Sequence, residues 1–134
     1  MSDYEILNLR EVDDIASRSG MPEGMEARFP KRQLGSQKVA VSLQRLSPNL
    51  RGPFGHRHGT QEELYVIVAG GGRVNLGGDV REVTAWDVVR VGPDVTRNFE
   101  AGPDGLEWLA FGGPIAEEND AEIVPGWWGD EARP

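Results

Sequence analysis

Two histidines and a glutamate give this sequence its clearest chemical signal. His56 and His58 are the only histidines in the chain, and they stand one residue apart in the stretch from Pro53 to Gly70. Side chains alternate along an extended strand, so both imidazoles share one face. Glu63 begins a run of β-forming residues that ends at Gly70, and we expect a hairpin to bring it to the histidines. Two imidazoles and a carboxylate suit a divalent metal, so the sequence predicts a metal site at His56, His58 and Glu63.

The elements that would position this site form a series of short strands. Runs of β-forming residues alternate with Gly, Pro and Asn signals about every 8 to 12 residues, which is typical of a β-sandwich or barrel. We therefore expect an all-β protein, a small antiparallel β-barrel of the jelly-roll type. Gly70, Gly71 and Gly72 are expected to form a turn. The expected strands cover residues 39–46, 63–70, 73–76, 80–83, 86–91, 97–100 and 106–111.

Composition narrows the class of protein. The chain has 134 residues, 18 of them glycine, and a net charge of −8, and it has no cysteine. This length predicts a single domain over residues 1–134. The negative charge argues against nucleic acid or an anionic membrane as a partner. The lack of cysteine excludes disulfides and thiolate ligands, and no signal peptide or membrane-spanning run is visible. We expect a cytoplasmic protein.

Both ends of the chain differ from the middle. Residues 1–37 are read as an N-terminal arm, with a weak edge strand at 4–9, a helical turn at 12–16 and an irregular segment at 17–36. Residues 38–112 are expected to form the barrel. Residues 113–134 are expected to be a tail whose acidic run, 117–122, is solvated. Trp127 and Trp128 are too apolar for a free tail, so we expect them to cover the barrel or a partner subunit.

Two motifs in the middle of the chain resemble those of the cupin superfamily. His56-Arg57-His58, four residues, Glu63, six residues and Gly70 fit the first cupin motif, with Gly52 or Gly55 as a loose match to its leading glycine. The segment 86–99, with Asp87, Gly92 and Pro93, is similar to the second motif. The resemblance, over residues 38–112, implies a small single-domain cupin barrel. Because small cupins commonly exchange edge strands, it also implies a homodimer.

Arg97 stands where the resemblance places a third metal-binding histidine. Arginine has no free lone pair for a metal and would repel a nearby divalent ion. One interpretation keeps a three-ligand site for Fe, Mn, Ni or Zn on His56, His58 and Glu63. The other is a metal-free pocket in which Arg97 pairs with Glu63 or binds an anion. Tyr65 is a candidate for a second ligand contact, and Arg45 and Trp108 lie on strands that could also line the barrel.

Three functions stay open from the sequence. The first is a metal-dependent enzyme, similar to cupin dioxygenases or isomerases. The second is a metal-free module that binds an anionic small molecule through Arg97 and Tyr65. The third is a metal-free acid/base enzyme acting on a sugar-like substrate, with a histidine and Glu63 moving the proton. We expect a cupin-fold protein of unassigned activity with its site at His56, His58, Glu63 and Arg97.

Overall fold

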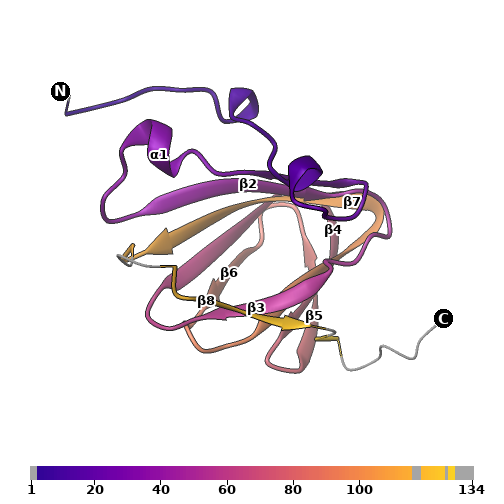
Figure 1. Cartoon of the computed structure of the whole chain (residues 1–134). Helices are drawn as coiled ribbons and strands as arrows, with labels where there is room; N and C mark the ends of the chain where they lie inside the picture. The colour runs from indigo at the N-terminus through magenta and orange to yellow at the C-terminus, as the bar shows by residue number, and fades with distance from the viewer. Residues whose placement is uncertain (1–2, 116–118, 126, 129–134) are drawn as a thin grey trace.

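One antiparallel sheet curls on itself to form the body of the protein (Figure 1). The computed structural model describes residues 3–115, 119–125 and 127–128. Strand β2 (Ala40–Leu46) lies on one side of the curl, and β3 (Phe54–His58) and β8 (Ala121–Pro125) lie on the other. The remaining strands are β1 (Met25–Arg28), β4 (Glu62–Leu76), β5 (Asp79–Thr84), β6 (Val88–Val91) and β7 (Arg97–Gly113). The predicted all-β antiparallel barrel is confirmed.

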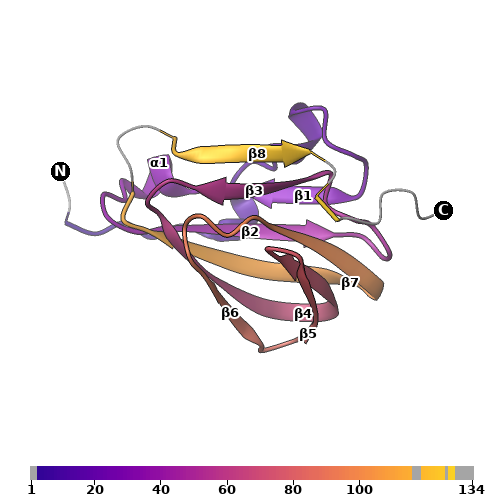
Figure 2. The same cartoon turned by 90° about the horizontal axis from the view of Figure 1, so that it is seen from below.

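The pairing of the strands explains how distant segments meet. The hydrogen-bonded order runs β1-β2-β7-β3-β8, while β4 pairs with β5, β6 and β7. Figure 2 shows β8 at the sheet edge beside β3. The expected hairpin between the His-x-His strand and the Glu63 strand is wrong, because β3 pairs with β7 and β8 and not with β4. These consecutive strands face each other across the curl instead, which still brings their inner side chains together.

The core fills the inside of the curl with apolar and aromatic side chains. Tyr65, Ile67 and Trp108 are almost fully buried, and the Phe99 ring stacks on Trp108 with centroids 4.4 Å apart. Alternation along the strands puts these residues on the inner face. Arg45 instead lies on the outside and pairs with Glu26 at 3.0 Å, so its expected place in the barrel is wrong.

The glycine run at 70–72 bends a strand rather than ending it. β4 continues through it to Leu76, with two register shifts against β7. Gly70 has a φ of 73°, and a Cβ there would lie 2.0 Å from the carbonyl oxygen of Gly105. Only glycine fits this backbone conformation and this close approach. The expected turn is therefore a bulged bend, and the strands expected at 97–100 and 106–111 are likewise one strand, β7.

The N-terminal arm is more regular than expected. The segment 4–9 forms no strand; two short 3₁₀ helices, η1 (Leu9–Glu11) and η2 (Ala16–Arg18), and the α-helical turn α1 (Lys31–Leu34) precede β2. The segment read as irregular contains β1, which pairs with β2 over four residues. The Asp14 carboxylate accepts hydrogen bonds from the backbone N–H groups of Ala16 and Ala27, each at 3.0 Å. That link holds the arm against the sheet.

The C-terminal tail also joins the sheet. β8 contributes five residues that pair with β3, so the part of the acidic run that is described is not a free solvated stretch. Trp128 is buried against the chain's own barrel, with the guanidinium groups of Arg51 and Arg73 at 4.5 and 5.3 Å from its ring centroid. Trp127 packs where a Cβ on Gly55 would clash with it. Residues 116–118, 126 and 129–134 of the expected tail lie outside the described residues.

No helix within the described residues is long and apolar enough to span a bilayer.

Candidate metal centre

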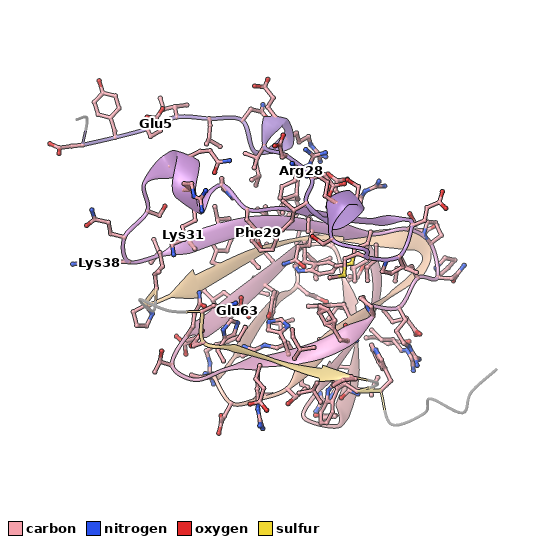
Figure 3. All side chains as sticks on the ribbon, in the orientation of Figure 1. Glu5, Arg28, Phe29, Lys31, Lys38 and Glu63 are labelled. Atoms are coloured by element: carbon pink, nitrogen blue, oxygen red, sulfur yellow. The ribbon has the colours of Figure 1, made fainter. Side chains whose placement is uncertain are left out.

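The three predicted ligands meet on the inner face of the barrel. His56 and His58 extend from β3 and Glu63 from the start of β4, where Figure 3 shows it in the centre of the molecule. Nε2 of His56 and Nε2 of His58 each lie 3.2 Å from Oε1 of Glu63. One ligand atom from each residue can be chosen so that all three lie within 4.8 Å of one another. A His56, His58 and Glu63 cluster that could bind a metal is therefore present.

The spacing of these atoms fits a metal of ordinary size. With metal–ligand bonds of about 2.1 Å, neighbouring ligand atoms stand about 3.0 Å apart at right angles and about 3.4 Å apart at the tetrahedral angle. The two nitrogen–oxygen distances of 3.2 Å fall between these values. Because His58 and Glu63 are both largely buried, few water molecules compete for these ligand atoms.

Asp120 contacts the His58 ring on the side away from Glu63 and fixes which ring nitrogen carries a proton. Its Oδ1 is 2.8 Å from Nδ1 of His58, and its Oδ2 accepts from the backbone N–H groups of Thr60 and Gln61 at 2.8 and 3.1 Å. Burial alone would raise the pKa of Asp120, but these N–H groups and His58 outweigh it and hold the pKa well below its usual range. An ionised carboxylate only accepts hydrogen bonds, so Nδ1 of His58 carries a proton.

This arrangement leaves Nε2 of His58 facing a second acceptor. In a neutral ring protonated on Nδ1, Nε2 presents a lone pair, and Oε1 of Glu63 stands 3.2 Å away. Two acceptors at this distance need a proton or a metal ion between them. Burial disfavours the charged ring, but the two flanking carboxylates outweigh it and raise the pKa of His58. The pair thus attracts either a second proton or a metal, and a carboxylate behind a metal-binding histidine is the usual outer support of such a site.

Glu63 receives donors from several sides. The Tyr65 hydroxyl donates to Oε1 of Glu63 at 2.5 Å, and Nη2 of Arg97 lies 3.4 Å from the same oxygen. Burial alone would raise the pKa of Glu63, but its contacts with both histidines and the hydrogen bond from Tyr65 lower it well below its usual range. Burial, with the negative charge of Glu63, raises the pKa of Tyr65 well above its ordinary value. Glu63 is therefore an ionised carboxylate in a fixed orientation.

Arg97 is the most deeply buried charged residue of the site, with none of its side chain exposed. Its Nη1 donates to the carbonyl oxygens of Val95 at 2.8 Å and Pro93 at 3.2 Å. The predicted pairing of Arg97 with Glu63 is present. Binding of a ligand by Arg97 and Tyr65 stays a prediction. Glu62 points outward, as expected, and pairs with Arg90 at 3.3 Å.

A cavity of about 540 Å³ opens onto the candidate ligands His56, His58 and Glu63. Its size is that of a site for a small molecule. Its walls are mostly apolar. They are supplied by the N-terminal arm, the C-terminal tail, and the strands β1, β2, β3, β4 and β7. Its apolar lining includes Ile15, Met21, Met25, Ala27, Phe29, Phe54, Ala110 and Ile115.

Sequence reasoning missed Asp120 and the part of the arm that lines the cavity. Asp120 is separated from His58 by 62 residues and belongs to a run of acidic residues with no distinguishing spacing. No local pattern could have singled it out. Apolar side chains do alternate with polar ones at Met25, Ala27 and Phe29, as on one face of a strand. The alternating run is about as short as β1 itself, too short to stand out in the sequence.

No known family model matches the chain, and no curated protein matches it either. Solved structures do. A cupin protein from Bacteroides fragilis superposes with a TM-score of 0.70 at 22% identity, covering 89% of this chain and 91% of that one. The chain has the cupin fold. The polyketide cyclase RemF from Streptomyces resistomycificus, another cupin-like match, gives a TM-score of 0.72 at 16% identity, over 92% of this chain and 85% of RemF.

A third match is to a longer protein. Oxalate decarboxylase from Lactobacillus farciminis gives a TM-score of 0.71 at 21% identity, over 87% of this chain but 35% of the enzyme. This chain therefore corresponds to about a third of that longer protein. At these identities the likeness establishes the cupin fold alone, because one fold hosts many activities.

Proposed function

We propose that this cupin binds a divalent metal ion through His56, His58 and Glu63 and is a metal-dependent enzyme acting on a small molecule in the adjacent cavity. The observation that carries the proposal is the position of His58 between two carboxylates. Asp120 accepts a hydrogen bond from the protonated Nδ1, so Nε2 turns its lone pair toward Oε1 of Glu63. A shared cation satisfies both acceptors at once.

The chain's own residues would each have a defined part. His56, His58 and Glu63 would hold the ion, with Tyr65 fixing the Glu63 carboxylate and Asp120 fixing the His58 ring. Bound iron, manganese, nickel or zinc supplies Lewis acidity toward a substrate oxygen, and iron or manganese also supplies redox chemistry. The apolar cavity wall would orient the substrate and exclude water. A dioxygenase- or isomerase-type reaction fits this set of roles.

The positive charge of Arg97 would repel a metal ion, and the groups around Arg97 weaken this repulsion. Its Nη1 points at backbone carbonyl oxygens, and Nη2 adds a contact with Glu63 at 3.4 Å. Carbonyl dipoles and the Glu63 charge offset part of the guanidinium charge. Two carboxylates, Glu63 and Asp120, then remain close to the proposed ion.

A metal-free acid/base enzyme is the second candidate, because the site contains three histidine–carboxylate contacts. His58 touches both Asp120 and Glu63, while His56 touches Glu63. Such a relay could move a proton between Asp120, His58 and Glu63. The mostly apolar cavity wall does not favour the sugar-like substrate considered from the sequence.

Isothermal titration calorimetry with Mn²⁺, Co²⁺ and Zn²⁺ on chelator-treated protein tests the proposal. We expect one site per chain in the wild type and no binding in a His56→Ala/His58→Ala variant, which lacks every histidine of the chain. Glu62→Gln, which alters an outward-facing carboxylate next to Glu63, should bind as the wild type does. Equal binding by the wild type and the double variant would overturn the metal site, and no binding by the wild type would favour the acid/base candidate.

A further inference from the structure

The cavity beside the metal cluster has an apolar wall and an uneven distribution of charge. Glu63 and Asp120 are the acidic residues that line it. Both are engaged: Glu63 by the histidines, Tyr65 and Arg97, and Asp120 by His58 and two backbone N–H groups. Neither carboxylate is therefore free to pair with a cationic group of an organic ligand.

Lys31 is the cation of this cavity. It lies at the start of α1, lines the cavity and is exposed, and it forms no ion pair with any residue that the structure describes. Among the described lining residues it is the only lysine or arginine. Figure 3 shows Lys31 and Phe29 close to β2, whereas Lys38 extends away from the molecule. Arg97 is fully buried and does not line this cavity; it lines an adjoining cavity of about 60 Å³ that shares His56 with it.

Exposed apolar side chains line the same cavity as Lys31. Phe29 is 46% exposed and Ile15 is 39% exposed, and both line the cavity together with Met21 and Met25. Large apolar side chains that stay exposed around a concave site mark a surface that a ligand covers. An apolar wall with one unpaired cation at its rim is complementary to a molecule with an apolar body and one anionic group.

We propose that the ligand of this cavity is a small carboxylate with an apolar body. Its carboxylate pairs with Lys31 at the mouth, its body packs against Met21, Met25 and Phe29, and its far end reaches His56, His58 and Glu63. A small apolar carboxylate is thus the substrate class of the site. Only the reaction that follows binding rests on the proposed function. Recognition by Lys31 and the apolar wall does not require the metal.

Heteronuclear NMR titration of chelator-treated protein with 4-phenylbutyrate and with its neutral amide tests this. Removing the metal prevents a carboxylate from binding through it, so this test is independent of the metal titration. We expect shifts confined to cavity-lining residues and about fivefold tighter binding of the carboxylate at low salt, falling as salt is raised. In Lys31→Met the two probes should bind equally, while Lys38→Met should keep the wild-type ratio.

Three results would overturn the proposal. The first is equal affinity for the carboxylate and the amide in the wild type. The second is an unchanged preference for the carboxylate in Lys31→Met, which would place the anion elsewhere. The third is no binding of either probe at the cavity.

Discussion

The Asp120 carboxylate lies 2.8 Å from Nδ1 of His58 and joins the segment that begins strand β8 to the three candidate metal ligands. It is also held by the backbone of the loop that separates β3 from β4. One side chain thus ties together three segments of the site. Its loss should change the metal site without removing any ligand.

Asp120→Asn should therefore lower the affinity for Co²⁺ by about 10- to 100-fold, the usual cost of losing a charged outer partner of a metal-binding histidine. The amide oxygen still accepts from Nδ1, but it carries no charge and cannot also accept from both backbone N–H groups. Competition titration with a chelating dye measures the change. Glu122→Gln, two residues away and paired with Arg57 on the surface, is the control and should leave the affinity unchanged.

The proton on His58 predicts how stability depends on pH in the chelator-treated protein. The pKa of His58 is raised on folding, so its contribution is full below its ordinary value of about 6.5 and is lost as pH rises through the folded value. The pKa of Glu63 is lowered, so its contribution is present above about 4.5 and is lost only at more acidic pH. The free energy of unfolding should fall between pH 6 and pH 8.5.

Urea denaturation at pH 6 and pH 8.5 measures this fall, and His58→Gln should abolish most of it. A wild-type free energy that rises over the same interval would contradict the position of His58 between two carboxylates.

Arg97→His should separate metal affinity from stability. It removes a fixed positive charge beside Glu63 and supplies a lone pair, so affinity for Co²⁺ should rise. It also leaves the carbonyl oxygen of Val95 without its donor and that of Pro93 with only the backbone N–H of His58, so the free energy of unfolding should fall by about 1 to 3 kcal/mol. Calorimetry and denaturation measure the two effects. Arg90→His, on the outer face, should change neither; unchanged affinity in Arg97→His would mean that geometry, and not charge, limits metal binding.

Trp128 should contribute to stability through the barrel itself. It is buried and lies between two guanidinium groups, those of Arg51 and Arg73. Trp128→Ala should cost about 3 kcal/mol of unfolding free energy, as truncation of a buried tryptophan usually does. Trp86, which is 74% exposed, is a matched control whose replacement by Ala should cost little. Similar costs for the two variants would show that the tail does not pack as described.

The barrel and its site could be predicted from sequence where the signal was local. Alternation over 39–46 predicted β2. The spacing of His56, His58 and Glu63 predicted that these three side chains, which could hold a metal, lie together. These depend on residues close together in the chain and on the two-residue period of a strand. The outward direction of Glu62 followed from the same period.

What the sequence could not show depends on contacts between distant segments. Asp120 reaches His58 only because β8 pairs with β3, and Phe29 and Lys31 reach the cavity because β1 pairs with β2. The length of β4 was hidden by Gly70, which reads as a turn and serves as a bulge. The homodimer expected from the sequence stays a prediction.

Elemental analysis of the protein as purified, without added metal or chelator, is the sharpest test of the proposed metal site. We expect close to one Fe, Mn, Ni or Zn ion per chain in the wild type and none in His56→Ala/His58→Ala purified in the same way. A wild-type protein that is metal-free, or a double variant that retains the ion, would contradict the assignment of His56, His58 and Glu63 as a metal centre.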